Sequence, residues 1–235
     1  MPSAALSIAS PEYSKRGMCG GASRYVGGDT SAATASLSAF SSNALSSVGS
    51  RASRHLSEQA PTLRRIEKEF GVPGAMTIVL WGLETDFGTH TGKHEVLRAT
   101  ATLGFDCRRS EFFQNELFEA LTLVQKGDLH PADLRGDWAG ELGQAHFLPS
   151  SYNKYAIDFD GNGKRDLIRS VPDTLASIAN YFKGYGWQPR QAYTEGTENF
   201  EVIRKWNKAL VYAKTVAAFA EKLDAHSAHA EQNRR

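Results

Sequence analysis

The clearest pattern along the chain is a series of segments in which apolar residues recur every three or four positions. One such stripe runs from Leu63 to Phe70 and ends at Gly71, and after Pro73 an almost continuous apolar run reaches Leu83. A helix with one buried face produces this spacing, whereas a half-buried strand alternates with a period of two. We therefore expect one helix before Gly71 and a second, largely buried helix after Pro73.

The rest of the chain continues this helical pattern and contains no convincing strand. The connections between its apolar segments are rich in glycine and polar residues, as expected for loops. The further helices are expected over residues 94–103, 110–126, 131–134, 171–185 and 200–223, the last with a break near Trp206. The pattern predicts a mainly α-helical domain with little or no β-sheet.

Residues 1–55 differ from this pattern, because Ser, Ala, Gly and Thr dominate and apolar periodicity is weak. We expect a poorly ordered or loosely helical leader there. The helical domain is placed at residues 56–223, followed by a polar tail at residues 224–235. The first residues show no basic segment followed by a long apolar run, so no signal peptide is visible in the chain as given.

Composition narrows the class of protein. The chain has 235 residues, which is enough for a substantial core, and 27 basic residues nearly balance 26 acidic ones. A nucleic-acid partner would require a basic excess or a basic stripe, and a transmembrane segment would require a longer apolar run, so we expect neither. Cys19 and Cys107 lie in unrelated contexts, and we expect two free thiols, with one disulfide between them as the alternative.

The first candidate for chemistry is a carboxyl group at the end of the most apolar helix. Glu84 directly follows Leu83, and Leu80 and Trp81 precede it on the same helical face. A carboxyl group held among apolar groups is poorly solvated, which favours the protonated form that a general acid requires. The alternative is a solvated glutamate at a helix end, and this segment alone favours that alternative.

The second candidate is a polar loop that begins at Asp158. Asp158, Asp160 and Asn162 supply oxygen side chains at positions 1, 3 and 5 of an EF-hand calcium loop, with glycine at position 6. Position 12, normally a bidentate glutamate, is Arg169, and Asp173 at the start of the next helix is available to replace it. The loop predicts a structural calcium site, and the alternative is a polar turn that binds nothing.

The third candidate is the stretch from residue 136 to residue 152, where glycines stand beside aromatic residues. Sugar-binding grooves combine such residues, because glycine allows a chain to approach closely and aromatic rings stack on pyranose faces. The alternative is an ordinary packed turn.

Six motifs in a fixed order connect these candidates to a known family. They are Gly-Leu-Glu-Thr-Asp-Phe-Gly at 82–88, Trp-Ala-Gly-Glu-Leu-Gly-Gln at 138–144, Phe-Leu-Pro-Ser-Ser-Tyr at 147–152, the loop at 158–166, Ala-Asn-Tyr-Phe at 179–182 and Trp-Asn at 206–207. Over about residues 60 to 223 the chain resembles the membrane-bound lytic murein transglycosylase B family, glycoside hydrolase family 103.

The resemblance implies a lysozyme-like helical fold and cleavage of the β-1,4 bond between N-acetylmuramic acid and N-acetylglucosamine in peptidoglycan. It implies a 1,6-anhydro product and one carboxyl group, Glu84, that acts first as acid and then as base. Ordinary glycosidases use two carboxyl groups, and no second acid at a fixed motif distance from Glu84 is obvious. A catalytically weakened or inactive peptidoglycan-binding protein of the same fold is the alternative.

The resemblance also implies a location, partners and cofactors. The chain is expected in the periplasm or cell envelope, acting as a monomer on peptidoglycan glycan strands, with a structural calcium ion and no organic cofactor. Its expected calcium ligands are Asp158, Asp160, Asn162, Asp173 and the backbone carbonyl of Lys164.

The residues at sugar-binding positions of the family are Asp137, His146, Tyr181, Asn207 and Tyr212, of which Tyr181, Asn207 and Tyr212 match the residues that the family has there. Two of them depart from the family pattern: Asp137 stands in place of a cleft serine, and His146 in place of the usual glutamine. A histidine can become charged, whereas a glutamine cannot. His146 therefore either keeps one hydrogen bond of the glutamine or weakens substrate binding.

Overall fold

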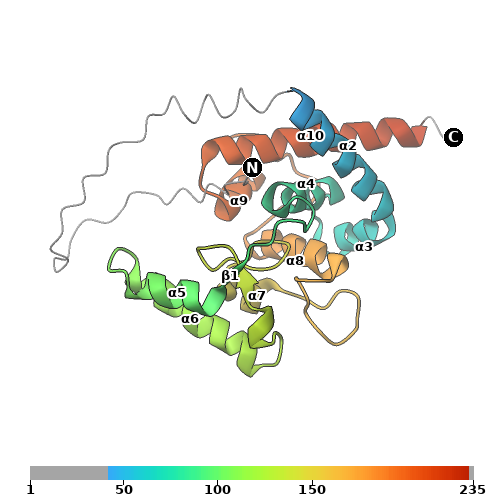
Figure 1. Ribbon diagram of the computed structural model, residues 1–235. Coiled ribbons are helices and arrows are strands. Elements are labelled where there is room, and N and C mark those ends of the chain that lie inside the picture. Colours follow the sequence, from blue (N-terminus) through green and yellow to red (C-terminus); the bar gives the residue numbers. More distant parts are fainter. Residues whose placement is uncertain (1–41, 233–235) are drawn as a thin grey trace.

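The structure is a computed structural model that describes residues 42–232, and these residues are mainly helical (Figure 1). The predicted mainly α fold is confirmed. The only sheet among the described residues pairs two short antiparallel strands, His94 with Gly136 and Glu95 with Arg135. The elements are α2 (Ser42–Glu58), α3 (Ala60–Phe70), α4 (Gly74–Thr85), β1 (His94–Glu95), α5 (Val96–Phe105), α6 (Ser110–Gln125), η1 (Pro131–Asp133), β2 (Arg135–Gly136), α7 (Pro149–Tyr155), α8 (Val171–Gly184), α9 (Glu198–Trp206) and α10 (Leu210–Gln232).

Helix α4 is the centre of the core. Every residue from Gly74 to Trp81 is buried, and the helix packs against α2, α3, α8 and α10 (Figure 1). A helix that is apolar on all sides is stable only when it is covered on all sides. The C-terminal turn of α4, which carries Glu84, is therefore fixed by the packing of four other helices.

The connection between α3 and α4 depends on a glycine. Gly71 has a positive φ of 72°, and a Cβ atom there would lie 2.4 Å from Cγ of Pro189. Any other residue would be strained by the backbone conformation and by the contact. The expected end of the first helix at Gly71 is confirmed.

Helix α2 lies across the boundary that was expected near residue 55. It places Ala52 in the core, and Arg51 forms a 2.7 Å ion pair with Asp86, two residues beyond Glu84. The ring of His55 lies 5.0 Å from that of Trp81. The described part of the expected leader is thus a helix that supports the end of α4, and residues 1–41 lie outside the described residues.

Three other expectations are modified. Helix α10 continues to Gln232, so the expected polar tail is helical where it is described. Cys107 is disulfide-bonded, so the expectation of a free thiol is wrong for this residue, and Cys19 lies outside the described residues. The helix expected from residue 94 begins at Val96, because His94 and Glu95 pair with β2. Between residues 42 and 232, no helix is both long and apolar enough to span a membrane.

Candidate active site

The segment after Glu84 is hydrogen-bonded to the loop between β2 and α7, residues 137–148. The hydroxyl of Thr85 donates to the carbonyl of Gln144 at 2.8 Å and accepts from the N–H of Gly88 at 3.0 Å. Gly88 has a φ of 82°, and a Cβ atom there would lie 2.4 Å from Oε1 of Gln144. Gln144 is buried, and its Oε1 accepts a 3.0 Å hydrogen bond from Nε1 of Trp81. Gln144 therefore positions the segment that carries the catalytic candidate.

The two carboxyl oxygens of Glu84 have different surroundings. Oε1 accepts a 2.8 Å hydrogen bond from Nε1 of Trp206 and a short one from the hydroxyl of Tyr212. Among the described residues, Oε2 accepts no hydrogen bond, and its charged or ionisable neighbour is Nδ1 of His146 at 3.8 Å. The Glu84 side chain is 14% exposed. Oε1 is therefore anchored, while Oε2 is available for proton transfer.

His146 is buried beside this second oxygen without a hydrogen bond of its own. Its side chain is 6% exposed, and neither ring nitrogen has a hydrogen-bond partner within the described part of the chain. The 3.8 Å separation from Glu84 is too long for a hydrogen bond but short enough for a strong charge interaction when the imidazole is protonated. His146 also has a φ of 47°, a left-handed conformation in which histidine is more frequent than most residues.

A second carboxyl group lies in the same site, and the motif distances did not reveal it. Burial, then the negative charge of Glu84, then that of Asp137, raise the pKa of Glu141 from 4.5 to about 7. Burial, together with Glu84 and Glu141, also raises the pKa of Tyr212 well above its usual range. No second acid was obvious at a fixed motif distance from Glu84, but the fold brings Glu141 close enough for the Glu84 charge to act on it. The available signal was an acidic residue within the glycine-rich stretch at residues 138–144.

The remaining sugar-binding candidates are distributed around this centre. Asp137 shares the loop of Glu141, and its Oδ1 accepts from the N–H of Trp138 at 2.7 Å. Tyr181 lies behind the site: its ring packs edge-on against Trp206, and its hydroxyl donates to the carbonyl of Lys205. The structure therefore brings Tyr212 and His146 to Glu84, places Asp137 beside Glu141, and leaves Tyr181 as a support for Trp206.

Asn207 follows Trp206 at the end of α9. Its Oδ1 accepts a 3.0 Å hydrogen bond from the N–H of Ala209, which shapes the turn into α10. Trp206 itself was part of a recognised motif but was not expected to contact Glu84. Its contact depends on the fold of α9 against α4, which the spacing of residues along the chain does not indicate.

The expected calcium residues form a separate cluster at the start of α8. Asp158, Asp160 and Asp173 each offer a carboxylate oxygen, and these oxygens lie within 4.8 Å of one another. Asp173 is fully buried, and its carboxylate accepts hydrogen bonds from the N–H groups of Phe159 and Asp166 at 2.8 and 2.9 Å. Burial raises the pKa of Asp173 although these hydrogen bonds oppose the shift.

Asn162 and Lys164 complete the turn, because Oδ1 of Asn162 accepts from the N–H of Lys164 at 2.9 Å. Arg169, at the position of the usual bidentate glutamate, instead forms ion pairs with Asp133 and Asp166 at 2.5 and 3.4 Å. The positive charge of Arg169 is thus neutralised by two other carboxylates. Three clustered carboxylates, two in the turn and one on the first turn of α8, match the oxygen ligands that calcium prefers.

The described residues form a mainly helical protein of the lysozyme-like class. Its central helix ends in a partly buried glutamate that is held by two aromatic donors. The family model described as transglycosylase SLT domain matches residues 28–195 of the chain. The chain belongs to this family, and the resemblance inferred from the motifs is confirmed.

Individual relatives agree with this assignment. Over 126 residues the chain is 41% identical to the membrane-bound lytic murein transglycosylase B of Escherichia coli K12, covering 53% of this chain but only 35% of that protein. The chain therefore spans about a third of the length of this relative.

Solved structures show the same fold. The soluble lytic transglycosylase SltB1 of Pseudomonas aeruginosa superposes with a TM-score of 0.73 at 30% identity, over 77% of this chain and 80% of that one. SltB3 of the same species, in complex with NAG-NAM-pentapeptide, gives 0.71 at 28% identity, over 75% and 63%. Slt35 of Escherichia coli, in complex with calcium, gives 0.69 at 26% identity, over 77% and 75%.

Proposed function

We propose that this protein is a peptidoglycan lytic transglycosylase in which Glu84 is the single acid and base. The observation that carries the proposal is the asymmetry of the Glu84 carboxyl group. Trp206 and Tyr212 donate to Oε1, while Oε2 accepts no hydrogen bond from the described residues. Two donors fix the orientation of the group and leave one oxygen to exchange a proton with a substrate.

The reaction follows from this arrangement. Protonated Oε2 of Glu84 gives its proton to the oxygen that links N-acetylmuramic acid to N-acetylglucosamine, and the bond from that oxygen to the muramoyl C1 breaks. The carboxylate then takes the proton of the muramoyl 6-hydroxyl while O6 bonds to C1, which closes the 1,6-anhydro ring. Glu84 ends protonated as it began, and no water is consumed.

Glu141 is a second ionisable group beside Glu84. Burial, and after it the negative charge of Glu84, raise the pKa of Glu141 to about 7, so this carboxyl group retains a proton at a higher pH than an isolated glutamate would.

Purified protein incubated with murein sacculi tests the proposal. The expected products are 1,6-anhydromuropeptides identified by mass spectrometry, and Glu84→Gln is expected to abolish them. The glutamine retains an oxygen that can accept from Trp206 and Tyr212, so the variant should fold normally. Products with only reducing ends would indicate a hydrolase, and equal product from wild type and Glu84→Gln would exclude Glu84 as the acid.

A second candidate function is peptidoglycan binding with weak or no turnover, and His146 is the observation that favours it. Its Nδ1 lies 3.8 Å from Oε2, the oxygen that must exchange the proton, and neither ring nitrogen has a hydrogen-bond partner among the described residues. In this case the protein should sediment with sacculi without releasing products. His146→Gln should then restore turnover, and continued inactivity of that variant would place the defect elsewhere.

We further propose that Asp158, Asp160, Asn162, Asp173 and the carbonyl of Lys164 hold a structural calcium ion. Support comes from the carboxylate cluster and from the solved complex of Slt35 with calcium. The ion would screen the mutual repulsion of the carboxylates and brace the loop against α8. The proposed role of the ion is structural, and no step of the reaction above uses it.

The relative named membrane-bound lytic murein transglycosylase B supports a location in the periplasm or cell envelope, where glycan strands are present. We propose this location for the chain and a monomer as its working form. Fractionation of cells that express the protein, together with sedimentation of the purified protein, tests both statements.

A further inference from the structure

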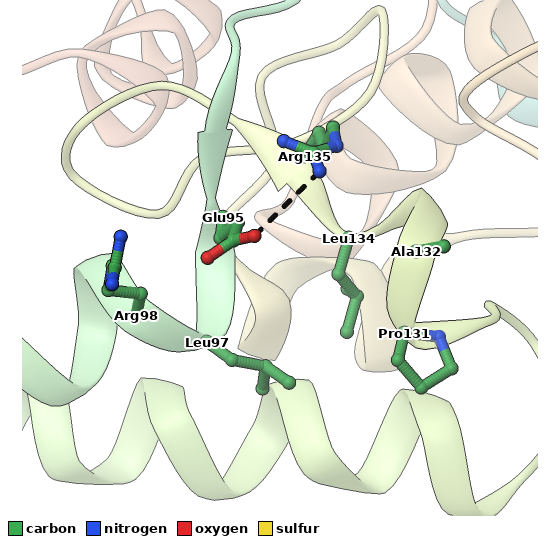
Figure 2. A pocket seen from close by; sticks show the side chains of 7 residues that line it. All are labelled: Glu95, Leu97, Arg98, Pro131, Ala132, Leu134 and Arg135. Atoms are coloured by element: carbon green, nitrogen blue, oxygen red, sulfur yellow. Dashed lines mark ion pairs between the residues drawn. The ribbon is translucent and has the colours of Figure 1, made fainter.

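A pocket on the surface beside the active-site loop has no role in the mechanism above. Its volume is about 530 Å³, and its lining includes Lys93, Glu95, Arg98, Arg135 and Trp138. A smaller hollow of about 330 Å³ adjoins it and shares Glu95, Arg98 and Arg135 (Figure 2). Figure 2 shows Arg98 on the first turn of α5 and Arg135 on β2, with Glu95 between them.

The charges of this pocket are unbalanced. Three cationic side chains face one carboxylate, and Glu95 forms its 3.7 Å ion pair with Arg135. Within the described part of the chain, Lys93 and Arg98 have no ion-pair partner. Both side chains are exposed and are free to bind an anion. An uncharged sugar would not require them.

The exposed ring of Trp138 forms another wall of the pocket. It is 54% exposed, although large apolar side chains are usually covered. A flat aromatic surface beside two unpaired cations suits a ligand that carries both apolar groups and carboxylates. A peptide with several carboxylates has this composition.

The pocket is built from the two segments that lead away from the catalytic carboxyl group. Lys93 lies on the loop that follows α4, and Trp138 lies on the loop that carries Glu141. These segments touch, because a Cβ atom on Gly92 would lie 2.1 Å from the carbonyl group of Gly136. The loop that bears Trp138 is also bonded to the residue after Glu84, because the hydroxyl of Thr85 donates to the carbonyl of Gln144 at 2.8 Å, and it therefore joins the pocket to the active site. A ligand that extends from the active site along this loop would reach the pocket.

We propose that this pocket binds the carboxylates of the stem peptide carried by a muramoyl residue of the glycan strand bound at Glu84. The inference rests on the proposed function, because only a peptidoglycan substrate presents such a peptide. The pocket would then select strands that still carry their peptides, and it would contribute to binding rather than to the chemical step.

Kinetics on two substrates test this inference: glycan strands with intact stem peptides, and strands from which an amidase has removed them. Removal of the peptide leaves the lactyl carboxylate on the muramoyl residue. The comparison therefore distinguishes binding of the peptide carboxylates from binding of the lactyl carboxylate. We expect Arg98→Ala to lower kcat/KM about threefold on peptide-bearing strands, through KM, and Lys93→Ala with Arg98→Ala to lower it about tenfold, as for exposed charge pairs. On peptide-free strands these variants should have the same kcat/KM as wild type. For wild type, kcat/KM should fall more steeply with rising salt on peptide-bearing strands than on peptide-free strands.

Arg64→Ala is the matched control, because Arg64 is exposed on α3 and does not line the pocket. This variant should leave kcat/KM unchanged on both substrates. An equal fall in kcat/KM on both substrates would mean that Lys93 and Arg98 bind the lactyl carboxylate or the glycan, and it would overturn the inference. An unchanged kcat/KM on both substrates would overturn it as well. If wild type forms no anhydro product from either substrate, the proposed function fails instead. In that case, binding of peptide-bearing and peptide-free strands to wild type and to Arg98→Ala, measured by calorimetry, decides the inference separately.

Discussion

Glu141→Gln should stabilise the protein in a strongly pH-dependent way. Burial and the charges of Glu84 and Asp137 raise the pKa of Glu141 from 4.5 to about 7 in the folded chain. A difference of this size corresponds to about 3 kcal/mol, since each tenfold change in proton affinity is about 1.4 kcal/mol. The folded state therefore binds this proton more tightly than the unfolded state does.

The sign follows from that difference. Below pH 4.5 the carboxyl group is protonated in both states and has no effect on the free energy of unfolding. Between pH 4.5 and 7 the unfolded state loses the proton first, so stability falls as pH rises, and above pH 7 the full penalty is present. Glutamine has the same shape without the charge. We expect Glu141→Gln to change the free energy of unfolding little at pH 4 and to raise it by up to about 3 kcal/mol at pH 8.

Urea unfolding at pH 4, 6 and 8, followed by tryptophan fluorescence, measures this effect. Glu69→Gln is the control, because Glu69 is exposed on α3, and its effect should be small at every pH. The gain from Glu141→Gln should be smaller in a Glu84→Gln background, where one source of repulsion is gone. An equal effect at pH 4 and pH 8, or a loss at pH 8, would refute the electrostatic account of Glu141.

Other parts of the structure yield three further predictions. Tyr212→Phe removes a donor to Glu84 Oε1 and should lower kcat on glycan strands about tenfold or more, since a hydrogen bond to a charged group contributes about 1.5–3 kcal/mol. Glu116→Ala removes the acceptor for the N–H and hydroxyl of Ser150 at the start of α7, and it should lower the free energy of unfolding by about 2–3 kcal/mol in urea. Calcium chelation should lower the Tm of wild type, and Asp173→Asn should remove this response, as calorimetric scans with and without calcium would show.

Each of these has a matched comparison. Tyr193→Phe removes a hydroxyl hydrogen bond far from Glu84, to Asp224, and should leave kcat unchanged; an equal loss in both variants would contradict the role of Tyr212. Glu116→Gln keeps an acceptor oxygen and should lose less stability than Glu116→Ala, and equal losses would exclude the hydrogen bonds as the cause. A Tm of wild type that is insensitive to calcium would contradict the metal site.

Most of the fold could be predicted because its helices bury one face, and that burial is visible in local sequence. The stripe from Leu63 to Phe70 and the apolar run before Glu84 both became helices that end close to the expected residues. Helix α2 was not predicted as part of the domain. Arg51 and His55 contact the C-terminal end of α4 and Ala52 is buried in the core, and these residues among many serines and alanines do not form a clear apolar stripe.

The active site was predicted less completely for a related physical reason. Glu84 stands out locally, since a carboxyl group ends an apolar helix. Trp206 and Tyr212 lie more than a hundred residues further along the chain, and only the packing of α9 and α10 brings them to it. Glu141 was hidden because its importance depends on burial and on the charge of Glu84, and neither is encoded in the residues beside it.

The arrangement around Glu84 separates the groups that hold its carboxyl group at Oε1 from the ionisable groups of the loop between β2 and α7. Trp206 and Tyr212, from the two C-terminal helices, contact Oε1 and fix the orientation of the side chain. His146, on the loop between β2 and α7, faces Oε2, and Glu141 of the same loop lies close enough for the charge of Glu84 to raise the pKa of Glu141. Changes in that loop can therefore alter proton transfer without moving the carboxyl group. For this reason the presence of His146 is compatible with an intact fold and an intact anchor, and its consequence should appear in the rate of the chemical step rather than in stability.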